Sequence, residues 1–175
     1  MDAKLKEKIS AIFASCRTKS NVPLSAWARR THVRRHIRSA GRGGSPELLR
    51  LLRENQYLLE RESRIVAREL RSFSRVDRVL SLDGRPALCR IFDAFFGSAA
   101  ACAGSFGTAE LNEERLASVL AAASELMELA AAELCLVPLA LRMALTGCAW
   151  AAFLRGDDSA PGDVRYAAKA LHDVY

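Results

Sequence analysis

Leucine, isoleucine and valine recur at three- and four-residue spacing along residues 46–73, and this spacing constrains the fold more than any other feature. One stripe consists of Leu48, Leu52, Leu59, Val66 and Leu70, and it is widened by Leu51, Leu58 and Ile65. Apolar residues in this pattern lie on one face of an α-helix, here of about eight turns. Such a face has to be buried against other elements. The spacing therefore predicts a long amphipathic helix that begins at Pro46.

The rest of the chain contains further helix-forming segments separated by short breaks. We expect helices over residues 2–16, 24–40, 86–103 and 112–154, and a short last helix that ends at 175. Asn112 caps the fourth of these, which either kinks or restarts around Pro138. Residues 82–86 are expected to form a loop, and no segment alternates convincingly as a strand does. The prediction is an all-α fold, an antiparallel bundle of about six helices.

Composition agrees with that fold class. Half of the 175 residues are apolar and only 7% are aromatic, and alanine and leucine supply most of the apolar share. These are helix-forming residues, whereas the residues that strands favour are scarce. The length suits one compact domain. Within it we distinguish basic N-terminal helices over 1–44 from a helical bundle over 45–175.

The most apolar stretch, residues 134–154, is about long enough to span a bilayer, but it contains Pro138, Arg142 and Gly147. An arginine at the centre of a membrane helix costs roughly 2.5–3.5 kcal/mol. We therefore expect a buried core helix here. The charged N-terminus lacks the apolar run of a signal peptide. The expected location is the cytoplasm, or the inner face of the membrane.

The five cysteines are an odd number, and no two of them form a closely spaced pair. We expect free thiols that pack as small apolar side chains in a reducing compartment. The chain has no phosphate-binding loop, no nucleophile motif and no zinc-protease motif. The sequence thus predicts no catalytic residue, no metal and no cofactor.

A basic stretch without any acidic residue lies between Glu7 and Glu47. Its expected surface consists of Arg29, Arg30, Arg34, Arg35 and Arg38. Such a field attracts phosphates or acidic protein surfaces. Three interpretations stay open: a solvated helix face, docking to a membrane surface or a partner, and nucleic-acid binding. His32 and His36 are four residues apart, but no further ligand completes a metal site.

Two groups of carboxylates are candidates for acid–base chemistry. Glu54, Glu60, Glu62 and Glu69 alternate with arginines at three- and four-residue spacing, which is typical of surface ion pairs. Glu133 differs because it lies within an apolar run, where an ionised acid needs a partner. We expect a buried link from Glu133 to Arg64 or Arg68.

Two separated stretches carry a resemblance to a known family. Residues 53–70, RENQYLLERESRIVAREL, resemble a segment near the start of cyclic β-1,2-glucan synthases, with the pattern N-Y-x-L-I/L-E-x-E/Q-x-R. Residues 133–145, ELCLVPLALRMAL, are similar to a later segment, E-L-W-x-L/I-P-x-x-L-R-x-A-L. The helix start at Leu111-Asn112-Glu113-Glu114 lies between them in the expected order. The resemblance covers about residues 46–155, and Cys135 stands where the relatives have an aromatic residue.

The resemblance implies a place upstream of the transferase domain in large membrane enzymes that build β-1,2-glucans from UDP-glucose. The catalytic motifs of that family have no counterpart among these 175 residues, so no catalytic residue is carried over. The resemblance implies a non-catalytic helical scaffold or docking module, with Glu133, Arg142, Asn55 and Glu62 as structural polar links. Its expected partner is a glycosyltransferase polypeptide or the rest of a parent enzyme. The alternative is a free-standing basic protein that binds nucleic acid or an anionic membrane.

Overall fold

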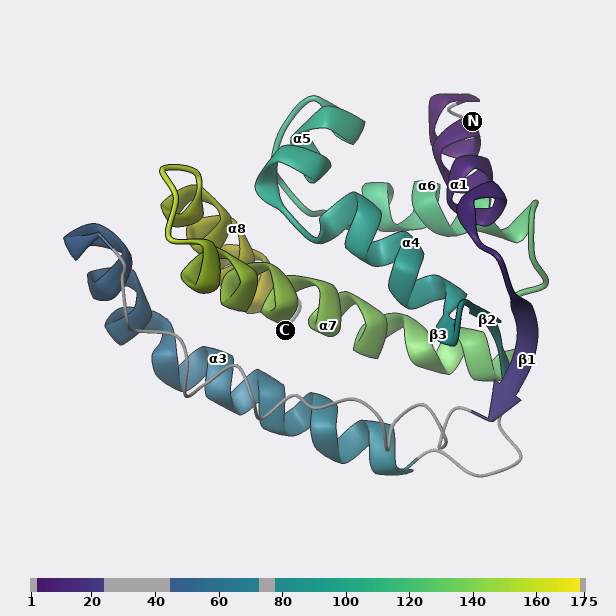
Figure 1. Cartoon of the computed structure of the whole chain (residues 1–175), viewed down its shortest axis with the longest axis horizontal. Coiled ribbons are helices and arrows are strands. Elements are labelled where there is room, and N and C mark those ends of the chain that lie inside the picture. The colour runs from purple at the N-terminus through teal and green to yellow at the C-terminus, as the bar shows by residue number, and fades with distance from the viewer. Residues whose placement is uncertain (1–2, 24–44, 73–77, 174–175) are drawn as a thin grey trace.

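A computed structural model describes residues 3–23, 45–72 and 78–173. These residues form seven helices and three short strands (Figure 1). The helices are α1 (Ala3–Ser15), α3 (Pro46–Ser72), α4 (Ala87–Phe96), α5 (Ala99–Phe106), α6 (Glu113–Ser124), α7 (Ala131–Arg155) and α8 (Ala160–Asp173). The mostly helical fold is confirmed. The expected helix over 24–40 lies outside the described residues.

The core is centred on α7, which packs against α8, α4 and α3. In Figure 1, α4 lies on one side of α7 and α3 on the other, and α3 runs opposite to α7. Three phenylalanines of α4 are fully buried in this core, namely Phe92, Phe95 and Phe96. Alanines of α7 and α8 allow these two helices to approach closely. Of the remaining helices, α1 packs on α6 and α4, and α5 packs on α4 and α8.

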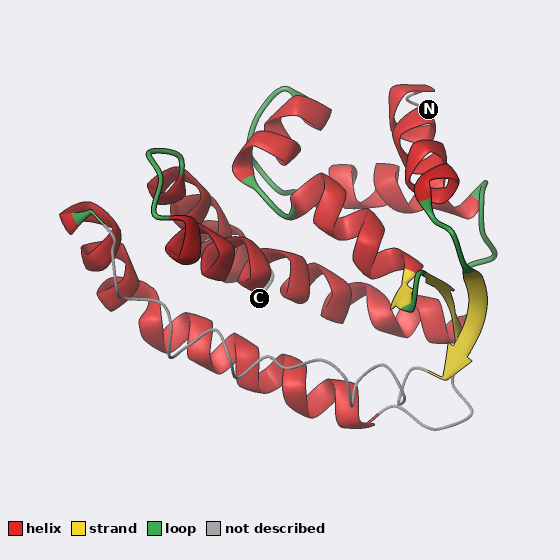
Figure 2. Ribbon diagram, in the orientation of Figure 1, coloured by secondary structure: helices red, strands yellow, loops and turns green. Residues whose placement is uncertain are grey.

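A small antiparallel sheet was missed by the sequence prediction. Its strands are β1 (Lys19–Pro23), β2 (Arg78–Leu82) and β3 (Arg85–Pro86), in the order β1-β2-β3 (Figure 2). The segment expected to be a loop at 82–86 is instead a tight hairpin. Its turn consists of Asp83 and Gly84, both with positive φ, at 51° and 77°. An Asp-Gly pair is a strong hairpin signal, because both residues tolerate this conformation.

Asp83 also fastens the turn to the chain that follows α1. Its Oδ1 accepts hydrogen bonds from the backbone N–H groups of Arg17 and Thr18, at 3.0 and 2.8 Å, and from the Thr18 hydroxyl. Arg90 of α4 lies 3.5 Å from the other carboxylate oxygen. These donors, above all the Thr18 N–H, hold the pKa of Asp83 below its ordinary value of 3.8. The ionised carboxylate therefore joins the hairpin to the end of α1.

We predict a pH-dependent effect of Asp83→Asn on stability. Because the folded-state pKa is lowered, the stabilisation by Asp83 is complete above its unfolded pKa of about 4 and is lost as pH falls through the folded value. Asparagine keeps the turn conformation but carries no charge. The unfolding free energies of wild type and variant should differ most near neutral pH and converge in acid. Urea titrations across pH measure this, and a difference independent of pH would contradict it.

The helix expected over 86–103 is two helices. It breaks at Gly97 and Ser98, and α4 and α5 meet at an angle of 85°. Ser98 caps α5, since its side chain accepts the N–H of Ala101 at 3.0 Å. A serine side chain at this position competes with continuation of the preceding helix. The Gly97-Ser98 pair was therefore a local signal that one helix ends and another begins there.

The long helix expected from Asn112 to Leu154 is also divided, but not at Pro138. Asn112 caps α6 as predicted, with its Oδ1 accepting the N–H of Arg115 at 3.0 Å. The break falls after Ser124, and α7 then continues through Pro138. Proline removes one helix hydrogen bond, but Pro138 and Leu134, whose carbonyl loses the donor, are both exposed. Water can donate a hydrogen bond to that carbonyl oxygen, so the helix tolerates the proline.

By length and apolar composition alone, α7 is one described helix that could cross a membrane. More than half of its most apolar stretch is buried against the rest of the protein. Arg142 lies inside this helix and faces α3 through ion pairs. Such burial is what the interpretation as a core helix requires.

Candidate functional site

A buried cluster of charged side chains joins α3 to α7. Glu62 of α3 is fully buried, and its Oε2 lies 3.6 Å from Nε of Arg142 on α7. Arg61 contacts the other oxygen of Glu62 at 3.0 Å. Nη1 of Arg142 also donates to Glu69 at 3.2 Å. Two carboxylates of α3 thus hold one guanidinium of α7.

The contacts within this cluster are unequal. The 3.6 Å between Glu62 and Arg142 exceeds a hydrogen-bond distance, so this contact is mainly electrostatic, whereas the contacts of Glu62 with Arg61 and of Arg142 with Glu69 are hydrogen bonds. An isolated carboxylate at the position of Glu62 would be costly to bury, and the guanidinium offsets that cost. The cluster therefore specifies which faces of α3 and α7 meet.

Trp150 extends the polar contacts between the two helices. Its indole Nε1 donates to the hydroxyl of Ser63 at 3.2 Å, and both residues are buried. Ser63 is the neighbour of Glu62 in α3, and Trp150 lies about two turns beyond Arg142 in α7. Trp150 was not among the site residues predicted from sequence. The available signal was that a buried tryptophan usually needs a partner for its N–H.

Of the four predicted polar links, the structure brings together only Glu62 and Arg142. Asn55 donates to the carbonyl oxygen of Leu51, one turn back in the same helix, at 2.9 Å. This bond is local to α3. Glu133 instead joins α7 to β2.

Glu133 is buried as predicted, but its expected partner was wrong. Its Oε1 accepts the backbone N–H of Leu80 in β2 at 2.9 Å. Arg64 and Arg68 are exposed on α3, and Arg64 pairs with Glu60 instead. Among the described residues, Oε2 of Glu133 has no hydrogen-bond partner. The acid is tolerated because it lies in the first turn of α7, near the positive end of the helix dipole.

We predict that Glu133→Gln changes the free energy of unfolding by less than about 1 kcal/mol. Glutamine keeps an oxygen for the Leu80 N–H and removes a buried charge, but it loses the favourable dipole interaction. Glu133→Leu should cost about 1–3 kcal/mol, since it leaves that N–H without an acceptor. Chemical denaturation measures both. Equal losses in the two variants would show that the charge, rather than the hydrogen bond, matters.

Three of the five cysteines are packed in the core. All five are free thiols, and Cys89, Cys102 and Cys148 are buried. Burial raises the pKa of Cys89 and of Cys148 to about 12, which keeps these thiols protonated and unreactive. Within the described parts of the chain, no group of three histidine, cysteine or acidic side chains could hold a metal ion.

The outer side of α3 carries a stripe of exposed residues that we call the arginine face: Tyr57, Arg61, Arg64, Arg68 and Arg71. These residues line a surface hollow of about 590 Å³, together with Glu60 and Ile65. Tyr57 is 80% exposed, the highest value among the large apolar and aromatic residues that the structure describes. The predicted surface ion pairs occur between Arg50 and Glu54 and between Arg64 and Glu60. The prediction was wrong for Glu62, which is fully buried, and both Glu62 and Glu69 pair with Arg142 of α7 because α3 packs against that helix.

The basic surface predicted from sequence, Arg29, Arg30, Arg34, Arg35 and Arg38, lies outside the described residues. The arginine face is a basic surface within the described part of the chain.

No protein-family model, no curated protein and no solved structure matches this chain.

Proposed function

We propose that this chain is a non-catalytic helical scaffold or docking module. It resembles the N-terminal region of a UDP-glucose-dependent β-1,2-glucan synthase, on the two stretches quoted above. The observation that carries the proposal is the buried ion pair between Glu62 and Arg142. Each of these residues comes from one of the two stretches, which belong to α3 and α7. A pair of motifs that meets in this way supports a shared structural role for them.

The state of the polar groups favours a scaffold over an enzyme. Glu62 and Glu69 are engaged by Arg142, and Glu133 by the backbone of β2. Asp163 is likewise engaged, since it accepts the N–H of Ala99 and the guanidinium of Arg155. A general acid or base needs a proton path to a bound substrate. These carboxylates instead join helices to other helices or, for Glu133, to β2.

The proposed partner is a glycosyltransferase polypeptide, either as a separate protein or as the rest of a parent enzyme. The proposed place of action is the cytoplasm or the inner face of the membrane, where such an enzyme meets UDP-glucose.

Affinity purification from the source cell tests this function. The tagged chain should retain a glycosyltransferase, and the eluate should make β-1,2-glucan from UDP-glucose. The purified chain alone should show no such turnover. An Arg142→Met chain provides a control, because loss of the α3–α7 contact should reduce the retention. A folded chain that retains no glycosyltransferase, or that turns over UDP-glucose by itself, would refute the proposal.

A second candidate is a basic protein that binds nucleic acid or an anionic membrane, and the exposed arginines of α3 favour it. This candidate predicts duplex or vesicle binding whose affinity falls steeply with salt. Absence of binding at low salt would refute this second candidate.

A further inference from the structure

The charges of α3 are sorted between its two sides. The helix contains six arginines and five glutamates, so its own net charge is close to zero. Three of the glutamates contact arginines of other helices: Glu62 and Glu69 contact Arg142, and Glu47 contacts Arg165 of α8. Arg64, Arg68 and Arg71 of the arginine face are instead exposed. A nearly neutral helix therefore presents a basic outer side.

The ion pairs already present leave much of this basic charge uncompensated. Arg64 pairs with Glu60 on the same helix, but its side chain is 80% exposed, so the pair contributes little and exchanges easily. Arg71 donates to the carbonyl oxygen of Ala67. Among the described residues, no carboxylate pairs with Arg68 or Arg71. A partner that carries carboxylates can therefore form ion pairs with these guanidinium groups.

The spacing of the arginine face is that of a helix–helix seam. Positions 57, 61, 64, 68 and 71 alternate steps of four and three residues, the 3.5-residue repeat with which one helix contacts another. The stripe extends over about 21 Å of helix. Tyrosine and arginine are also among the side chains that contribute most binding energy at protein interfaces.

Charge complementarity selects the occupant. The chain's own stretch between Glu7 and Glu47 is basic and contains no acid, so it does not complement the arginine face. A second copy packed through the same face would place arginine against arginine. Glu60 lies in the hollow and repels phosphate, whereas a protein partner can pair it with a lysine.

We propose that the arginine face of α3 docks an acidic helix of a partner protein, with glutamate or aspartate at three- and four-residue spacing. This inference rests on the proposed docking function and names the chemistry of the partner segment. Arg64, Arg68 and Arg71 pair with its carboxylates, and Tyr57 packs on its apolar atoms.

The test uses the full chain and a labelled, alanine-based helical peptide of about 21 residues, with glutamates at alternating three- and four-residue steps. A scrambled peptide of the same composition places its glutamates around the whole helix. Fluorescence anisotropy should show that the ordered peptide binds about tenfold more tightly than the scrambled one. Arg64→Glu/Arg68→Glu should weaken binding about tenfold or more, because each reversal replaces attraction by repulsion.

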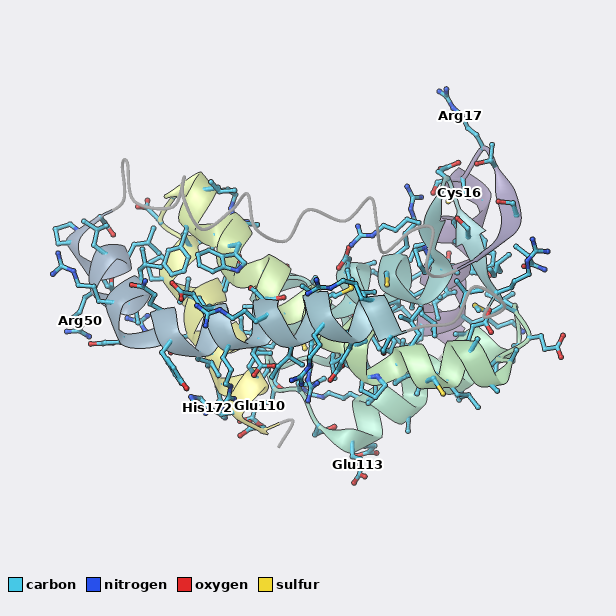
Figure 3. All side chains as sticks on the ribbon, turned by 90° about the horizontal axis from the view of Figure 1, so that it is seen from below. Cys16, Arg17, Arg50, Glu110, Glu113 and His172 are labelled. Carbon is cyan, nitrogen blue, oxygen red and sulfur yellow. The ribbon has the colours of Figure 1, made fainter. Side chains whose placement is uncertain are left out.

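The matched control is Arg17→Glu/Lys19→Glu, which changes the charge equally. Figure 3 shows Arg17 at the end of the molecule opposite Arg50 of α3, and both control residues are exposed. The control should change the affinity less than about twofold. Circular dichroism checks the fold, and Arg68→Gln alone replaces the double variant if that variant is unfolded.

Equal binding of the two peptides, or no effect of Arg64→Glu/Arg68→Glu, would overturn the inference. The inference would also be overturned if an oligonucleotide or a phosphatidylserine vesicle displaced the peptide and if these substitutions weakened the binding of that competitor to the chain. The two proposals fail separately. If Arg64→Glu/Arg68→Glu leaves retention of a glycosyltransferase intact, the docking face is wrong and the function stands. If the peptide binds but no glycosyltransferase is retained, the function is wrong and the face stands.

Discussion

Replacing Arg142 with methionine is expected to lower the free energy of unfolding by about 3 kcal/mol. The substitution removes the guanidinium that lies against fully buried Glu62, while Arg61, which is 42% exposed, remains on the other carboxylate oxygen. Removing one partner of a buried pair leaves a charge in a medium that solvates it poorly. Glu69 is 38% exposed, so the loss of its contact costs little. Urea denaturation followed by circular dichroism measures the change.

Two further variants separate this effect from a general loss of packing. Arg165→Met removes another arginine that pairs with a glutamate of α3, but both side chains of that pair are about half exposed. We expect a cost below about 1 kcal/mol there. Glu62→Met/Arg142→Met replaces both charges by apolar groups and should recover most of the stability lost in Arg142→Met. A double variant no more stable than Arg142→Met would contradict the argument.

Replacing Trp150 with alanine is expected to cost about 3–5 kcal/mol. Trp150 is 4% exposed, and its ring lies 5.9 Å from the ring of Phe153. The substitution opens a cavity between α3 and α7, and it also removes the donor to the buried hydroxyl of Ser63. Thermal and chemical unfolding should both report the loss.

Trp150→Phe distinguishes volume from hydrogen bonding. Phenylalanine fills most of the space but cannot donate to Ser63, so we expect a cost of about 1–2 kcal/mol. Combining it with Ser63→Ala should remove most of that cost, because no buried polar group then lacks a partner. If Trp150→Phe were as harmful as Trp150→Ala, the hydrogen bond rather than the ring would be the main contribution.

Local sequence signals predicted the helices whose ends depend on nearby residues. The apolar spacing of α3 and the Asn112 cap of α6 both appear in the structure. Gly156, with φ of 66°, caps α7 after Arg155, one residue beyond the predicted end at residue 154. In each case a periodicity or a single side chain within one turn determines the outcome.

The missed elements also had local signals, but of a weaker kind. The Asp83-Gly84 pair is a hairpin signal, but residues 82–86 were expected to form a loop because the flanking strands are too short to show alternation. Strand β1 pairs with β2 across more than fifty residues, so its formation depends on long-range contact. Sequence patterning within a window does not contain that information.

The amino-acid sequence alone determines the helical class, the long amphipathic helix α3 and the need of Arg142 and Glu133, which lie in an apolar stretch, for polar partners. These follow from periodicity and from the cost of burying a charge. The choice of partners belongs to the tertiary structure. Arg142 meets Glu62 and Glu69 because α3 and α7 pack in opposite directions, and Glu133 meets Leu80 because β2 passes the start of α7. The same packing turns three glutamates of α3 toward other helices and leaves its arginines outside, since residues distant in sequence become neighbours only when the helices assemble.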